Sequence, residues 1–207
     1  MFKAVQTFCV LLIIVSFSCH HSNSFVKENT VTIDIQPFSG IGDEEVNYVF
    51  SELKKVYPDV NLNRSIPLQA SAFYAARNRY RADSLIQFLD RRTARGHVTI
   101  GLTGKDISTT KNGIADWGVM GFGFCPGKAC IASSFRLSNA EKLMQLFKVA
   151  IHELGHTQGL PHCSVSSCFM RDAEGRNPTN EEKDFCVECK RWLANKGWNF
   201  KIPPAIK

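Results

Sequence analysis

The feature that most constrains this chain is residues 152–163, which read HELGHTQGLPHC. His152 and His156 are four residues apart, so on a helix they lie on one face and their imidazoles can converge on one metal ion. Glu153 stands beside them as a carboxylate that need not bind the metal and can act as a base on water. This spacing is typical of a catalytic zinc site.

The residues that follow predict a sharp end to the helix. Gly159 permits a positive φ at little steric cost, and Pro161 prevents the helix from resuming. The chain can then turn back so that His162 becomes a third ligand, which leaves one zinc position open for water or substrate. Histidines placed on a helix by chance are the alternative. Five fixed residues over eleven positions make that alternative less favoured.

The downstream residues extend the pattern. Met170 lies two residues after Cys168, and Cys186 and Cys189 form a Cys-x-x-Cys. Together with the histidine segment and its adjoining Cys163, this arrangement over residues 152–189 resembles the archaemetzincins, a family of metzincin metallopeptidases. Residues 98–137 are also similar to the sheet of that family. The fifteen residues between Met170 and Cys186 are slightly fewer than is typical, a difference that falls in the intervening loop.

The resemblance implies a fold, an activity and specific roles. It implies a metzincin-like α/β fold, with a twisted mixed sheet, backing helices, an active-site helix and a small C-terminal zinc-bound subdomain. It implies that Met170 forms the turn beneath the catalytic ion, and that residues 129–135 are an edge strand that binds an extended peptide. It also implies a second, structural zinc, so that two zinc ions are expected per chain. The implied ligands of the structural zinc are Cys163, Cys168, Cys186 and Cys189.

The cysteine spacing agrees with a metal site on physical grounds. His162 and Cys163 are consecutive, so their side chains can point toward two different ions, and a zinc held by thiolates would clamp the turn that presents His162. Two disulfides among the same four cysteines are the alternative, although the spacing and context favour metal. A redox pair is not favoured, because no thioredoxin-like pattern surrounds Cys186.

Residues 1–18 have the pattern of an export signal. Lys3 is followed by ten apolar-rich residues, 8–17, which are too few for a membrane-spanning helix of about 20 residues. Ser18 before Cys19 resembles a bacterial lipoprotein signal, with cleavage before Cys19 and lipid on its thiol. We expect an exported lipoprotein, anchored to a membrane and facing the periplasm or the cell exterior, with residues 19–29 as a tether. A conventional secretory signal or an uncleaved anchor would still export the domain.

Residues 30–207 are long enough for a single catalytic domain. A capping box at Ser138 and Glu141 is expected to open the helix that carries the histidines. The periodicity of apolar residues predicts the remaining elements. Strands are expected at 31–35, 98–102, 115–124 and 129–135, and further helices at 43–57, 83–95 and 179–195.

The charge of the chain and its remaining cysteines restrict the classes of partner that are expected. The net charge is +6, but acidic residues are interspersed among the arginines of residues 77–95 and the chain is expected to be exported, so nucleic acid is not expected as a partner. A disulfide between Cys125 and Cys130 is slightly favoured over two free thiols outside the cytosol. The expected partners are a peptide or protein substrate and a membrane reached through the lipid anchor, and the chain is expected to be a monomer.

These features predict a zinc-dependent metallopeptidase in which Glu153 is the general base toward water activated by zinc. The alternative is a non-catalytic surface lipoprotein that zinc stabilises. A binding module has no need of Glu153, so the intact glutamate favours the enzyme.

Overall fold

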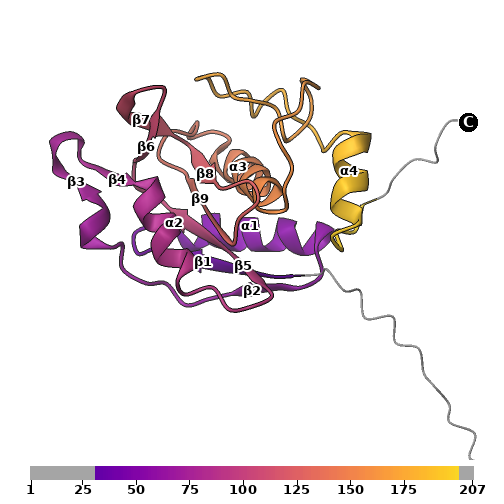
Figure 1. Ribbon diagram of the computed structural model, residues 1–207, viewed down its shortest axis with the longest axis horizontal. Helices are drawn as coiled ribbons and strands as arrows, with labels where there is room; N and C mark the ends of the chain where they lie inside the picture. The colour runs from indigo at the N-terminus through magenta and orange to yellow at the C-terminus, as the bar shows by residue number, and fades with distance from the viewer. Residues whose placement is uncertain (1–30, 201–207) are drawn as a thin grey trace, which may run out of the picture.

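The computed structural model describes residues 31–200, and a five-stranded sheet lies at its centre (Figure 1). The strand order is β2-β1-β5-β9-β8; the first four strands are parallel and β8 is antiparallel to β9. The predicted signal, the lipid-bearing Cys19 and the tether lie outside the described residues. The strands are β1 Thr32–Pro37, β2 Val60–Leu62, β5 His97–Thr103, β8 Gly121–Gly123 and β9 Ala129–Ser133.

Three helices cover the two faces of this sheet. Helices α1 (Asp43–Val56) and α3 (Lys142–Thr157) pack on one face, and α2 (Ala82–Asp90) packs on the other (Figure 1). Side chains of β9 alternate between the two faces, because Cys130 and Ala132 join the core on the α3 side while Ala129 and Ile131 join the core on the α2 side. The sheet is therefore buried on both sides where α3 crosses it. No helix among the described residues is long and apolar enough to cross a membrane.

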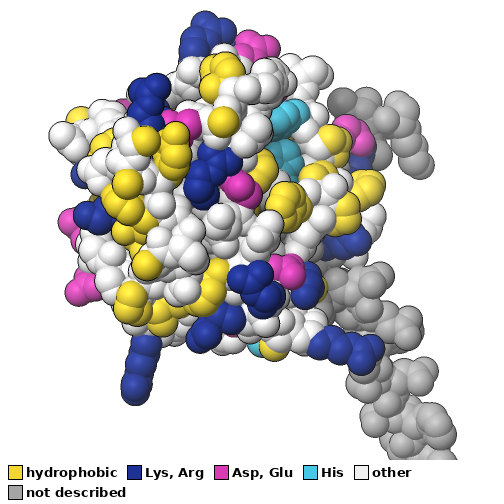
Figure 2. Space-filling view, turned by 60° about the vertical axis from the view of Figure 1, so that its left-hand side comes forward, with side chains coloured by type: hydrophobic (Ala, Val, Ile, Leu, Met, Phe, Trp, Pro, Cys, Tyr) yellow, Lys and Arg dark blue, Asp and Glu magenta, His cyan; other side chains and the backbone are white. Residues whose placement is uncertain are grey.

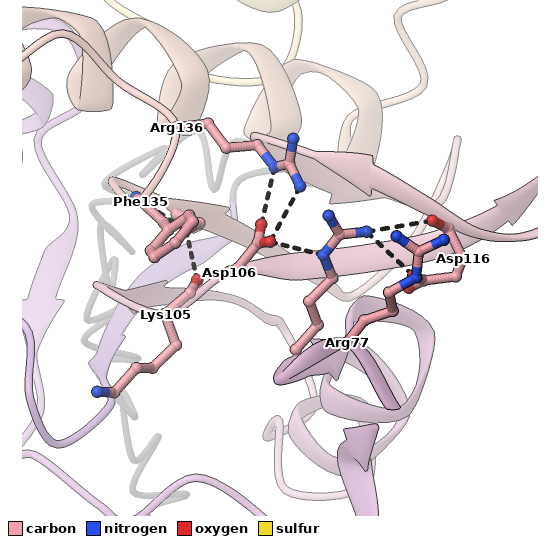
Figure 3. A network of polar contacts seen from close by, with 8 residues as sticks. Arg77, Lys105, Asp106, Asp116, Phe135 and Arg136 are labelled. Atoms are coloured by element: carbon pink, nitrogen blue, oxygen red, sulfur yellow. Dashed lines mark hydrogen bonds and ion pairs between the residues drawn. The ribbon is translucent and has the colours of Figure 1, made fainter. Parts of the chain in front are cut away.

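A second, smaller sheet has the order β3-β4-β6-β7. A buried ion-pair network joins it to the loop before α3, because Asp106 accepts from Arg79 at 2.6 Å and from Arg136 at 2.7 Å (Figure 3). The strands of this sheet and the two short 3-10 helices beside it have these bounds: η1 Ala70–Ala72, β3 Phe73–Tyr74, η2 Ala75–Arg77, β4 Arg79–Arg81, β6 Ile107–Lys111 and β7 Ile114–Val119.

The C-terminal part is an irregular segment that ends in α4 (Val187–Ala194). An aromatic cluster fastens it to α1: the ring of Trp198 lies 5.0 Å from that of Tyr57 and 6.4 Å from that of Phe185. Lys148 of α3 is buried and donates to the carbonyl oxygens of Thr179 and Glu182, each at 2.6 Å. Helix α3 is thus hydrogen-bonded to this segment through a buried side chain.

The structure confirms the mixed α/β class and corrects several elements. Residues 115–124 are not one strand, because the chain leaves the small sheet after β7 and enters the large sheet as β8. The expected edge strand at 129–135 is wrong: β9 lies between β5 and β8, so β8 is the edge. Pairing partners that are distant in sequence decide both points, and a periodicity pattern does not reveal them.

Three predicted helix boundaries also differ. The helix expected over 83–95 ends at Asp90, where the Thr93 hydroxyl donates to the Leu89 carbonyl. The helix expected over 179–195 begins only at Val187, because Lys183 and Asp184 form backbone hydrogen bonds with Ser167 and Phe169 instead. The capping box does not form: α3 begins at Lys142, and the Ser138 N–H donates to the Gln145 side chain.

Candidate metal centre

Helix α3 and the turn after it bring three histidines together. The rings of His152 and His156 lie 4.6 Å apart between centroids, and the ring of His162 lies 5.4 Å from the first and 4.8 Å from the second. One nitrogen of each ring lies within 4.8 Å of the corresponding nitrogens of the other two. Figure 2 shows imidazole at the molecular surface on this side, with apolar side chains beside it.

The predicted helix exit is present. Gly159 has a φ of 89°, and its N–H donates to the His156 carbonyl at 2.8 Å. The Leu160 N–H donates to the Gly155 carbonyl at 3.0 Å, which completes a Schellman ending. This ending reverses the chain within a few residues and brings His162 back over the helix end.

The three imidazoles are oriented by their Nδ1 atoms. The Nδ1–H of His152 donates to the Phe169 carbonyl at 2.6 Å, and that of His156 donates to the Leu160 carbonyl at 2.8 Å. The Nδ1 of His162 lies 3.3 Å from a carboxylate oxygen of Asp172. An imidazole that donates from Nδ1 presents its lone pair at Nε2, so the histidine cluster offers the donor atoms that a zinc ion requires.

The electrostatics favour the neutral form of His152 and His156. Burial, reinforced by the neighbouring His156, lowers the pKa of His152 to about 3. Burial also lowers the pKa of His156. Both imidazoles are therefore neutral at physiological pH, which is the form that binds a metal.

Glu153 extends from α3 toward the edge strand β8 and is only 7% exposed. Burial raises the pKa of its carboxyl group to about 8. A carboxyl group in such an environment can accept and release a proton near neutral pH.

Met170 packs against helix α3 at Gly155. Its side chain is fully buried, and a Cβ atom added at Gly155 would lie 2.5 Å from its sulfur. Gly155 therefore provides the space that Met170 fills. The Met-turn role that the resemblance implies for Met170 stays a prediction.

The four C-terminal cysteines form a second cluster, with all four sulfurs within 4.8 Å of one another. All four are free thiols, and the sulfurs of Cys163 and Cys186 are 3.7 Å apart, well beyond a disulfide bond of about 2.05 Å. The alternative of two disulfides is therefore wrong for this structure. The Cys189 thiol and the backbone N–H groups of Cys186 and Met170 lower the pKa of Cys168 to about 5.

The two clusters share one backbone segment, residues 162–170. The Cys163 N–H donates to the Met170 carbonyl at 2.8 Å, and the carbonyl of Phe169, next to Cys168, orients His152. An ion held by the four sulfurs would therefore restrain the segment that supports the histidines.

The expected disulfide between Cys125 and Cys130 is wrong. Cys125 is exposed and donates to the Leu160 carbonyl, whereas Cys130 lies on β9 with its side chain buried in the core. The pleat of β9 directs Cys130 toward α3, because alternate residues of a strand face opposite sides.

Sequence reasoning did not identify several parts of the site. Asp172 carries an acidic side chain two residues after Met170, and that spacing was the only signal available for it. Gly121 and Gly123 lie against Glu153, but a pattern of glycines does not show what they contact. The carbonyl oxygens of Leu160 and Phe169 leave no mark in the sequence.

Comparisons with known proteins agree with this geometry. A family model described as matrixin, a peptidase group, matches residues 62–184. The archaemetzincin of Halobacterium salinarum is 28% identical over 173 residues, covering 77% of this chain and 97% of the relative. That of Archaeoglobus fulgidus is 29% identical over 162 residues, covering 76% and 95%.

Solved structures are similar as well. The crystal structure of the Archaeoglobus fulgidus archaemetzincin complexed with malonate has a TM-score of 0.67 at 28% identity and covers 78% of this chain and 99% of that chain. The Methanopyrus kandleri archaemetzincin has a TM-score of 0.67 at 23% identity, covering 80% and 95%, and supports the fold alone.

Proposed function

The chain belongs to the matrixin family of zinc metallopeptidases, and from this premise we propose that it hydrolyses peptide bonds with Glu153 as the general base. The resemblance to the archaemetzincins is confirmed by relatives that align over about three quarters of this chain, 77% for the Halobacterium salinarum protein. The observation that carries the proposal is the convergence of three oriented imidazoles beside one buried carboxylate.

We assign the catalytic zinc to His152, His156 and His162 through Nε2. The support is that each Nδ1 already faces an oxygen atom. A zinc ion held by these residues would supply polarisation of a water molecule and of the scissile carbonyl group. Three protein ligands leave room for the reactants.

Glu153 is the residue to which we assign proton transfer. Its carboxylate takes a proton from the attacking water and passes it to the leaving amine, and a pKa of about 8 is close enough to neutral pH for both transfers. The closeness of Glu153 to β8 excludes bulk water from one side of the carboxylate.

The free edge of β8 is the surface on which we place the substrate. The Ser133 N–H donates to the Met120 carbonyl at 2.7 Å, and Gly121 pairs with Ala132 at the next position. Because antiparallel pairs alternate, Gly121 and Gly123 direct their N–H and C=O groups away from β9. An extended peptide can pair with these groups and lie above Glu153.

We assign a second, structural zinc to Cys163, Cys168, Cys186 and Cys189. The support is the four free sulfurs within 4.8 Å and the backbone N–H groups that donate to Cys168. Four thiolates are a ligand set of closed structural zinc sites.

Replacing the base tests the proposal. Glu153→Ala is expected to retain two zinc ions per chain by metal analysis and to lose about 10²- to 10⁴-fold in kcat on a responsive peptide. Glu44→Ala, in the exposed first turn of α1, is the matched control and is expected to be fully active. Unchanged hydrolysis by Glu153→Ala would show that Glu153 is not the base. A zinc-loaded chain that cleaves nothing in broad peptide mixtures would instead favour the non-catalytic binding lipoprotein.

We propose further that the chain is exported and anchored through lipid on Cys19, as a monomeric catalytic domain of residues 30–207. The support is the pattern of residues 1–19. Mass spectrometry of the mature N-terminus is expected to find a lipidated Cys19, and Cys19→Ala is expected to release the protein from membranes. An intact Met1 on the mature protein would exclude the cleavage. Analytical ultracentrifugation of the signal-free chain checks the monomer.

A further inference from the structure

Two glycines of the edge strand face the active-site helix. Gly121 and Gly123 lie on the α3 side of β8, while Phe122 between them packs into the core on the α2 side. The strand therefore carries a large side chain on one face and none on the other. Glycine weakens a strand interior, so two glycines on one face indicate a close approach that a side chain would prevent.

Gly123 sets the distance between strand and helix. A Cβ atom at this position would lie 3.1 Å from the Glu153 carbonyl oxygen and 3.2 Å from its carboxylate Oε2. The first of these is backbone, which a helix does not readily move. The absence of a side chain lets β8 lie directly against α3 at the level of the catalytic carboxylate.

Gly121 is in tighter contact with the side chain itself. A Cβ atom there would lie 2.5 Å from Glu153 Oε1, 2.7 Å from Glu153 Cγ and 2.7 Å from a methyl carbon of Val149. Val149 is buried and β-branched, so it has little freedom to yield. The Glu153 side chain would have to leave its present position.

We propose that Gly121 is a positioning residue of the peptidase: its missing side chain defines where the Glu153 carboxylate lies. The inference rests on the proposed function, because it acts through the base assigned there. The same glycine presents its backbone groups on the free edge of β8, so the carboxylate and the paired peptide are placed by one residue. A base displaced by about 1 Å can lose about 10²-fold in rate.

The test is a double-mutant cycle between Gly121→Ala and Glu153→Ala, read by kinetics and by thermal unfolding. Gly121→Ala is expected to lower kcat about 100-fold with KM and zinc content unchanged. It is also expected to lower Tm in the wild-type background and to lower it less beside Glu153→Ala, because the carboxylate and Cγ are then gone. Gly123→Ala, whose contacts are longer, is the graded control and is expected to lose less activity.

Three results would overturn the inference. The first is a Gly121→Ala enzyme with wild-type kcat. The second is a loss of activity together with zinc, and the third is a Tm decrease that is equal in both backgrounds, since either of these would show an effect on the fold rather than on Glu153. If Gly121→Ala does not fold, the same cycle is run beside Val149→Ala, which removes the other close contact.

The proposed function is tested by a different result from the one that tests the role of Gly121. An active Glu153→Ala enzyme contradicts the assignment of the base, whereas the Tm coupling between positions 121 and 153 reports their contact whether or not hydrolysis depends on it.

Discussion

At the scale of single residues, the site depends on partners of the ligands as much as on the ligands. His152 and His156 are oriented by backbone carbonyls, which substitution does not remove. His162 lies on a loop, and its partner is the side chain of Asp172. The Asp172 carboxylate is itself fixed, because its other oxygen accepts from the Glu174 N–H at 2.9 Å. Of the three proposed ligands, His162 is therefore the one whose orientation a point substitution can change.

Asp172→Asn is expected to weaken zinc binding at the histidine cluster by about 10- to 100-fold. The amide keeps an oxygen for the Glu174 N–H but turns a donor toward His162, which can no longer donate to it. Competition with a chromophoric chelator measures the affinity. Glu174→Gln, at an exposed side chain of the same turn, is the control and should bind zinc as the wild type does. Equal zinc affinity in Asp172→Asn would contradict a role for Asp172 in orienting His162.

At the scale of elements, α3 organises the molecule through its different faces. It carries two histidines and Glu153, packs against β9 and β8, and holds the C-terminal segment through Lys148. Helix α4 contributes two of the four cysteines at its start, since Cys186 is its N-cap residue and Cys189 lies in its first turn. The cysteine cluster therefore ties α4 to the loop that leaves α3.

Cys189→Ser is expected to reduce zinc from two ions to one per chain and to lower Tm, because binding energy at a structural zinc is also folding energy. The affinity of the histidine cluster is expected to fall too, since residues 162–170 support both clusters. Metal analysis and differential scanning calorimetry provide the readouts. Glu188→Gln is the matched control, because that side chain is exposed in the same first turn of α4 and lies outside the cluster. Two tightly bound zinc ions in Cys189→Ser would rule out the four-cysteine assignment.

At the scale of the whole molecule, two sheets and an irregular C-terminal segment surround one active-site helix (Figure 1). The ion pairs between Asp106, Arg79 and Arg136 connect the small sheet to the loop before α3. The two arginines of β4 thus have carboxylate partners within the fold. Trp117 of β7 also lies against Gly175 of the C-terminal segment, so the small sheet and this segment are in contact.

The sequence by itself determined the chemistry of this protein. The spacing of His152, Glu153 and His156 defines one helix face, and Gly159 with Pro161 ends that helix, so the histidine cluster follows from local geometry alone. The cysteine cluster could be predicted from a motif because each cysteine lies close in sequence to another member of it. The α/β class followed from periodicities that are equally local.

Only the tertiary structure decided the surroundings of that chemistry. The edge strand is β8 rather than β9, because strand order depends on pairing between distant segments. The partners of His152 and His162 are a carbonyl and a carboxylate that folding brings across the site, and neither is encoded by spacing to its histidine. Gly121 has a role only because β8 passes over Glu153 at a distance that no side chain permits. Local sequence patterns determine the chemistry available to each residue, and contacts between distant segments determine its position and its partners.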